Sequence, residues 1–353
     1  MSKRLSLQYY YNNDASLDTF TRLLTCFDAP LYFILKNKVT NIDNPCEAFL
    51  RDITFYLSQN SDGSIYDIGF LDNSINSDLF KLKWYGGKGN EALAQVEALL
   101  DARELVMIQT DTRKVPFLKN YQGTSSLDDG VAVPGHVFLA VYHDKTHLYY
   151  AEAPWNINTG NFNVYEGNES IGVIKKDDLR SAFDSFLNCI TITLNEDGLF
   201  KSDRMKTVIE KSAKNFDKKT LNSDGFIFSY GREAIERLID VCRREFLYLN
   251  QDVASYSLDL FGLLNWKLWD IVKRRQLLFQ YFVKHSNQFN SVDIDGLISV
   301  IDDDIKAWIG VIDIILKRNM EKKYMLDSQI QKYFMEIVDV EEKVNVGLKK
   351  IFT

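Results

Sequence analysis

The chain has 353 residues, of which 46% are apolar and 26% are charged, and its formal net charge is −7. This composition is typical of a globular protein and excludes a fibrous or a disordered chain. The acidic balance, with a sequence pI near 5.3, disfavours a nucleic-acid partner. No run approaches the roughly 20 apolar residues of a membrane-spanning helix. The polar start also shows no signal peptide.

The four cysteines are far apart and show no CxxC spacing. This pattern argues against a zinc site and against a disulfide framework, so neither a metal nor a cofactor is expected. A reducing, cytoplasmic location fits these residues best, with no membrane partner.

The first part of the chain mixes helix and strand signals. Apolar residues follow helical spacing from Leu17 to Leu31, with Asn13, Asp14 or Ser16 as the N-cap and Pro30 disturbing the far end. Two further helices are predicted over 46–58 and 90–102. Apolar runs and alternating residues predict strands over four segments: 104–110, 137–142, 148–153 and 189–194.

A polar, glycine-bearing loop over 123–130 separates the first two of these strands, and it is either a lid or a surface excursion. The pattern changes near 195–198, beyond which the chain is almost entirely helical in period. Long amphipathic segments with short connections are typical of an antiparallel helical bundle. A helical segment over 230–241 is followed by three such long segments, over 266–285, 294–318 and 325–352. We therefore predict an α+β fold with a sheet-containing domain over 1–197 and an all-α domain over 198–353.

The apolar runs 135–142 and 147–154 are joined by a polar turn centred near Asp144. If they pair as an antiparallel hairpin, positions whose numbers sum to about 288 lie opposite each other, so His136 faces Glu152. A carboxylate there would orient the imidazole and stabilise its charged form, as the base and orienting acid of a nucleophilic triad do. The alternative is an ordinary half-buried histidine at a strand start.

The nucleophile is harder to identify. We interpret Cys26 as a core residue of the first helix, and Cys189 and Cys242 as packing residues. Cys46 follows a proline at an expected helix start, where the helix dipole favours a thiolate. Ser16 is a nucleophile in type, although an N-cap role is simpler.

Several other polar motifs are interpreted as structural. The glycine-rich segment 84–89 lacks the GxxxxGK[ST] spacing of a phosphate loop and is expected to be a turn. The acidic run 302–304 lacks the ligand spacing of a calcium loop and is expected to be a solvated helix face. His143 and His147 flank the hairpin turn and are expected to be solvated, and His285 ends a helix, where a cation is favoured.

Three segments, in this order, resemble those of a known family. Residues 11–20, YNNDASLDTF, resemble the segment in which a cysteine opens the first helix; 106–111 resemble the strand before a loop; and 135–155 resemble the histidine and acid strands. The family is the butirosin biosynthesis protein H N-terminal family, a papain-like group related to peptidases that trim bacteriocin leaders. The tail, including 230–234 and 266–285, is similar to the helical region that often accompanies this domain.

The resemblance implies a papain-like fold in which His136 is the general base and Glu152 the orienting acid, where an aspartate is more usual. It places Ala15 at the nucleophile position, where a cysteine is expected. Two explanations stay open. A cysteine has been replaced by alanine to trap a substrate or intermediate, which we favour because the other two positions are filled, or the chain is a natural homologue that only binds a small molecule.

The same resemblance implies an oxyanion site and a reaction. Backbone amides around Asp14 and Ser16, with Gln8, would stabilise the oxyanion. An acyl thioester on an acyl or peptidyl carrier protein would be attacked by the cysteine. The acyl-enzyme would then be resolved by a small amine, such as a diamine or an amino sugar, in antibiotic biosynthesis. No cofactor is implied beyond the phosphopantetheine of the carrier protein. The alternative activity is that of a peptidase or amidase that uses water.

Overall fold

The computed structural model describes residues 24–38, 48–63, 65–70, 79–111, 114–118, 135–152, 163–165, 168–185, 187–195, 204–243, 260–289, 293–320 and 328–351. The chain forms two compact units. One comprises Met1–Pro45 with Asn76–Phe200, and the other comprises Cys46–Ile75 with Lys201–Thr353. The predicted boundary at 197 lies close to the division after Phe200. The first domain is not continuous as expected, however, because 46–75 belongs to the second unit.

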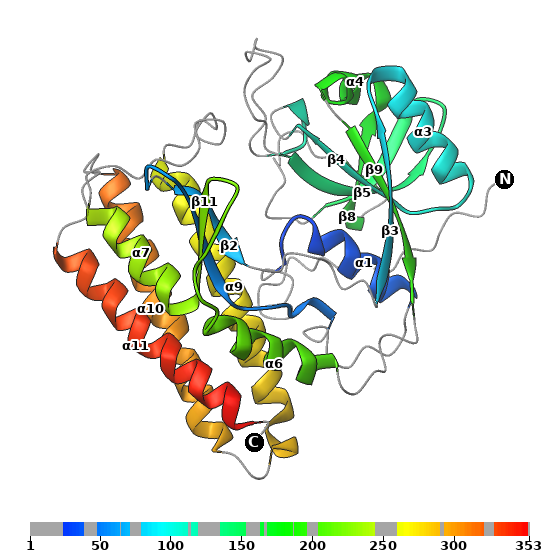
Figure 1. Cartoon of the computed structure of the whole chain (residues 1–353). Coiled ribbons are helices and arrows are strands. Elements are labelled where there is room, and N and C mark those ends of the chain that lie inside the picture. The colour runs from blue at the N-terminus through cyan, green and yellow to red at the C-terminus, as the bar shows by residue number, and fades with distance from the viewer. Residues whose placement is uncertain are drawn as a thin grey trace. The chain divides into compact units, whose positions relative to one another are not determined.

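The first unit is built on a seven-stranded antiparallel sheet in the order β3-β9-β4-β5-β6-β8-β7 (Figure 1). Its elements are α1 (Asp28–Lys38), β3 (Phe80–Gly87), α3 (Gly89–Asp101), β4 (Val106–Asp111), β5 (Gly135–His143), β6 (His147–Ala151), β7 (Asn163–Tyr165), β8 (Asn168–Lys175), α4 (Lys176–Ser185) and β9 (Leu187–Leu194). The helix predicted over 90–102 and the four predicted strands are confirmed to within a few residues.

Helices α3 and α4 cover one face of this sheet. Apolar side chains from both helices and from alternate strand positions form a continuous core that includes Val96, Phe138 and Phe183. Phe117 stacks on Tyr150 in this core, with ring centroids 3.9 Å apart. The core is typical of an antiparallel sheet whose alternating apolar positions face a helical layer.

Cys189 belongs to the same core, as its interpretation as a packing residue requires. Burial raises the pKa of its thiol to about 12, so it stays protonated at neutral pH. The segment 84–89, in contrast, does not form the expected turn. It ends β3 and begins α3, where Gly89 has a φ of +54° that favours glycine.

The second unit contains a four-stranded antiparallel sheet in the order β10-β11-β1-β2, together with long helices (Figure 1). Its elements are β1 (Phe55–Asn60), β2 (Ile65–Phe70), α6 (Arg204–Phe216), β10 (Leu221–Ser223), β11 (Phe226–Tyr230), α7 (Gly231–Arg243), α9 (Leu260–His285), a 3-10 helix (Ser286–Gln288), α10 (Ile294–Met320) and α11 (Ser328–Lys350). The four helices predicted beyond residue 229 are confirmed.

Two predictions about this unit are wrong. The region beyond 198 is not all-α, because β10 and β11 lie within it. The helix predicted over 46–58 is replaced at its end by strand β1, which pairs with β11 about 170 residues later in the chain. Local periodicity cannot reveal a pairing partner this distant, and short apolar runs fit helix and strand equally well.

A buried ionic cluster holds the second unit together. Arg275 of α9 donates from Nε to Asp304 of α10 at 2.9 Å and also pairs with Glu341 of α11. Its Nη1 donates to the carbonyl of Ile53 at 2.7 Å, which ties the segment before β1 to the helices. Trp308 Nε1 donates to Glu341 at 3.0 Å. The cluster explains why the 46–75 excursion packs with residues beyond 200.

Asp304 therefore corrects the expectation of a solvated acidic run. Successive helical residues point in directions about 100° apart, so only one of the three carboxylates is buried, while Asp302 is partly exposed and pairs with Lys306. Burial raises the pKa of Asp304 well above its usual range, and the nearby charge of Glu341 adds to the increase.

Replacing Arg275 with alanine is expected to destabilise the second unit by about 3–5 kcal/mol, because two buried carboxylates lose their shared cation. The matched control is Arg237→Ala, whose pair with Glu233 lies on the surface and is worth under ~1 kcal/mol. Chemical denaturation with tryptophan fluorescence measures both changes. Equal losses for the two variants would show that the cluster contributes nothing beyond a surface pair.

Candidate active site

Cys26 lies in the turn that leads directly into helix α1. The backbone N–H of Ala29 donates to the carbonyl of Thr25 at 3.0 Å, so helical bonding starts at Thr25. The Thr25 hydroxyl accepts from the N–H of Asp28 at 3.1 Å and donates to its carboxylate at 2.9 Å. Thr25 therefore caps the start of α1, and Cys26 lies in the turn between this cap and the helix. A negative charge on Sγ at this position is favoured by the helix dipole.

This geometry corrects the expected first helix. Residues 24–27 form a bend and a turn, so a helix does not run continuously from Leu17 to Leu31. Pro30 lies in the first turn of α1 and not at a far end. It lacks the N–H that would bond to the Cys26 carbonyl, and the first turn of a helix is where a proline is best tolerated.

His136 and Glu152 are brought together by strands β5 and β6. His136 is the second residue of β5 and is 7% exposed; Glu152 directly follows β6 and is 3% exposed. His136 Nε2 lies 2.6 Å from Glu152 Oε2, so the predicted contact is confirmed.

The register of the hairpin differs from the expected one. Leu139 faces Ala151, and after a shift Tyr142 faces Tyr149, so opposite positions sum to 290 or 291 and not to 288. The irregularity in β5 takes up an extra residue, which places Glu152 diagonally across from His136. A diagonal neighbour on the same face is within reach of a long side chain.

The imidazole of His136 interacts with both other groups. Burial lowers its pKa, but the attraction of Glu152 and a hydrogen bond with the Cys26 thiol outweigh burial and raise the pKa to about 10. The imidazole therefore stays charged at neutral pH. Since Nε2 is occupied by Glu152, Nδ1 is the ring nitrogen that remains for proton exchange with Cys26. The arrangement is that of a nucleophile, a base and an orienting acid.

The interpretation of Cys26 as a core residue is thus wrong. It is a free thiol of intermediate exposure beside a buried, charged histidine. The sequence held one signal for this position. Thr25 and Asp28 have the spacing of a capping box, which starts a helix at residue 25 and places the cysteine in its first turn.

The other predicted site residues lie outside the described residues. These are Gln8, Asp14, Ala15 and Ser16, and with them Cys46 and the loop 123–130. Their predicted roles remain predictions. The described residues bring together His136 and Glu152 from the expected set, and they add Cys26.

His143 is not solvated as expected, because only 14% of its side chain is exposed. Its Nε2 lies 3.1 Å from an Asp101 oxygen, and its Nδ1 lies 3.1 Å from Lys176 Nζ. Lys176 also pairs with Glu97 at 2.6 Å. These contacts join α3, β5 and the start of α4, which is a structural role.

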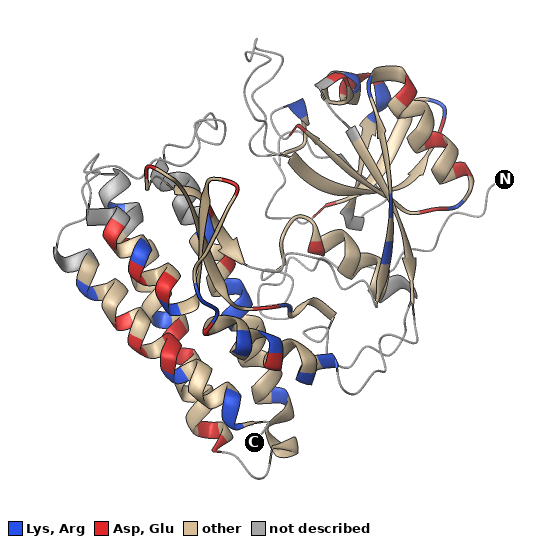
Figure 2. Cartoon of the chain, viewed as in Figure 1, with Lys and Arg blue, Asp and Glu red and all other residues tan. Residues whose placement is uncertain are grey.

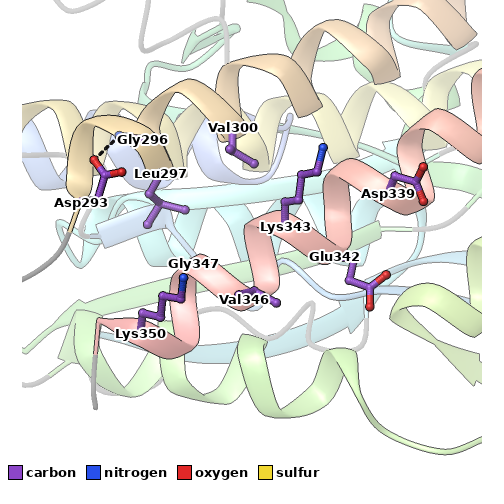
Figure 3. Close-up of a pocket in the computed structure, with 10 residues that line it drawn as sticks. All are labelled: Asp293, Gly296, Leu297, Val300, Asp339, Glu342, Lys343, Val346, Gly347 and Lys350. Carbon is purple, nitrogen blue, oxygen red and sulfur yellow. Dashed lines mark hydrogen bonds between the residues drawn. The ribbon is translucent and has the colours of Figure 1, made fainter.

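A pocket in the second unit lies between the first turns of α10 and the last turns of α11 (Figure 3). Its wall combines apolar side chains such as Leu297 and Val300 with charged ones of both signs, including Asp339 and Lys343. Mixed charges are spread over the helices of this unit (Figure 2). Among the described residues that line the pocket there is neither a histidine nor a cysteine.

Within the described ranges, no group of three or more histidine, cysteine or acidic residues is placed to hold a metal ion. In the same part of the chain, no helix is long and apolar enough to cross a membrane. A scan against protein-family models and a search of curated proteins both found no match to this sequence.

The raised pKa of His136 predicts a pH-dependent stability. The folded state holds the imidazole proton up to about pH 10, whereas the unfolded chain releases it near pH 6.5. The stabilisation is complete below pH 6.5 and is lost as the pH rises through 10. We expect the free energy of unfolding to fall by roughly 4–5 kcal/mol across this interval. Urea unfolding at several pH values measures it, and His136→Gln should show a flatter profile.

Proposed function

We propose that this chain is a cysteine-type acyltransferase in which Cys26 is the nucleophile, His136 the base and Glu152 the orienting acid. The observation that carries the proposal is the meeting of these three side chains in one unit. Cys26 opens a capped helix, and it shares the buried imidazole with a carboxylate 2.6 Å away. A thiol beside an oriented imidazolium is the machinery of covalent acyl transfer.

The proposed reaction has two halves. The Cys26 thiolate attacks the carbonyl carbon of an acyl thioester, and the tetrahedral intermediate expels the donor thiolate, which takes a proton from the His136 imidazolium. The neutral imidazole then accepts a proton from an attacking amine. Collapse of the second intermediate breaks the bond to Sγ, returns the thiolate and releases an amide.

The first turn of α1 supplies hydrogen-bond donors for the oxyanion. N–H groups in the first turn of a helix have no intrahelical acceptor, so those of Cys26 and Phe27 are available to a tetrahedral oxygen. Donors of this kind stabilise charge that develops in the transition state. The backbone amides expected around residue 15 lie outside the described residues.

We further propose that the first unit is papain-like and that the helices of the second unit form a bundle. A nucleophile at a helix start, with the base and the acid on neighbouring antiparallel strands, supports the first. The packing of α10 against both α9 and α11 supports the second. The butirosin biosynthesis protein H resemblance suggests a thioester on a carrier protein as the acyl donor and a diamine or an amino sugar as the acceptor.

An assay of acyl transfer tests this function. The protein is incubated with an acyl-loaded carrier protein or a small acyl thioester, with and without a panel of amines, and the products are read by mass spectrometry. We expect an acyl group on Cys26 and an amide that depends on the added amine. Release of the free acid at a rate that no amine increases would instead identify a hydrolase.

A further inference from the structure

An open polar strip lies on one face of the seven-stranded sheet. Gly86 of β3, Asn188 of β9 and Gln109 of β4 stand opposite one another in register, so their side-chain positions share a face. Asn188 Nδ2 donates to Gln109 Oε1 at 2.8 Å, and both side chains are partly exposed. A Cβ at Gly86 would meet no atom within 4 Å. The strip therefore presents two amides beside open space.

Each end of the strip lies beside a sequence neighbour of a catalytic residue, while the His136 side chain itself points, like its partner Thr110, to the opposite face of the sheet. At one end Trp84, two residues before Gly86 on the same face, is 52% exposed, and its ring centroid lies 6.1 Å from that of Phe27, the residue after Cys26. At the other end is Gly135, the residue before His136. A Cβ there would lie 3.0 Å from Gln109 Nε2. Glycine at this position therefore leaves room for the Gln109 side-chain amide beside β5.

The hydrogen bond between the two amides fixes what they offer to a ligand. Asn188 Nδ2 and Gln109 Oε1 are used by each other, which leaves Gln109 Nε2 as a donor and Asn188 Oδ1 as an acceptor. A peptide group carries the complementary carbonyl and N–H. An acyl chain made only of methylenes would leave both amides without partners, and a charged group would find no counter-charge among these neutral residues.

We propose that this strip binds the acyl group of the substrate, and that the acyl group is peptide-like with an apolar end. Its amide groups lie on Gln109 and Asn188, and its apolar end packs on the Trp84 ring. Three strand spacings separate β5 from β3, or about 14 Å, close to the length of four extended residues. The inference depends on Cys26 forming the acyl-enzyme, as proposed above.

Three donors test this assignment, all thioesters of the amide-free thiol 3-mercaptopropionate. They carry phenylacetyl-Gly-Gly, acetyl-Gly-Gly, or a phenylalkanoyl chain of the same length as the first but without amides. The measurement is kcat/KM for acylation of Cys26 in the full-length protein. We expect the first donor to exceed each of the others about tenfold or more, because it alone satisfies both the ring and the amides.

Two variants separate the two contacts. Trp84→Ala is expected to reduce kcat/KM for phenylacetyl-Gly-Gly about tenfold more than for acetyl-Gly-Gly. Gln109→Leu is expected to reduce kcat/KM for phenylacetyl-Gly-Gly about tenfold more than kcat/KM for the amide-free donor. Tyr142→Ala is the matched control, since it removes an exposed aromatic residue from β5 and should leave all three values unchanged. Thermal melting of each variant checks that it folds.

The outcomes distinguish the strip from the catalytic proposal. If Cys26 is acylated with equal kcat/KM by the three donors, the strip does not bind the acyl group and Cys26 remains the nucleophile. The same conclusion follows if each variant reduces kcat/KM equally for all three donors. Failure of every donor to acylate Cys26 would overturn the proposed function and the strip with it.

Discussion

Replacing Cys26 with alanine is expected to abolish acyl-enzyme formation and to lower kcat/KM by a factor on the order of 10³ or more. A methyl group cannot attack a carbonyl, and the histidine and carboxylate that remain have no nucleophile to activate. Cys26→Ser is expected to be nearly as inactive, because a serine hydroxyl beside a charged imidazole has no neutral base to take its proton. Intact-protein mass spectrometry after incubation with an acyl thioester measures the covalent step.

Cys189→Ala is the control for this experiment, because Cys189 is the other thiol that the structure describes as free. Its burial and its raised pKa predict neither labelling nor loss of activity. Ala15→Cys gives a second comparison, since the family resemblance places the nucleophile there. An acyl group that survives Cys26→Ala, or that forms only after Ala15→Cys, would move the catalytic thiol away from Cys26.

The histidine and its acid could be predicted from the sequence because their contact is local. The two strands are adjacent in the chain, and a hairpin brings residues sixteen positions apart together whatever the rest of the fold does. The register could not be predicted to the residue, since the turn is centred between Lys145 and Thr146 and not near Asp144, and an irregularity in β5 then changes the sum of paired positions from 291 to 290. The contact survived because the long glutamate side chain reaches a diagonal neighbour.

The role of Cys26 could not be predicted from helical spacing, because that spacing continues across the start of a helix. Leu17 to Leu31 fit one helix by period, yet Thr25 and Asp28 cap a new helix within that span. Apolar periodicity continues through a capped start, so periodicity alone hides it. The spacing of Thr25 and Asp28 is the stronger signal, because it predicts a capping hydrogen bond, which forms at the start of a helix.

The second unit contains long-range contacts that local sequence patterns do not predict. Its helices follow from amphipathic periods within single segments. The strand pairing of β1 with β11 joins residues about 170 positions apart, and the bond from Arg275 to the Ile53 carbonyl joins residues 222 apart. No local pattern encodes such a partner. An acidic run such as 302–304 looks solvated until the arginine that it faces is known.

Replacing Glu152 with glutamine is expected to lower kcat/KM by a factor on the order of 10²–10⁴ and to change its pH dependence. The amide can still contact His136 Nε2, but it carries no charge to stabilise an imidazolium, and it can favour the wrong tautomer. Because Glu152 is a main cause of the raised pKa of His136, its loss leaves burial to lower that pKa. The protonated form of the imidazole is then lost at lower pH.

The pH profile of kcat/KM in the free enzyme separates this role from a purely structural one. In the unmodified protein we expect kcat/KM to fall near pH 10, where His136 loses the proton that the reaction requires. In Glu152→Gln the fall should begin at lower pH. Glu152→Asp keeps the charge at a shorter reach and should restore part of the rate and of the alkaline limb. A Glu152→Gln profile that is lower but unshifted would mean that the carboxylate holds the ring in place without setting its charge.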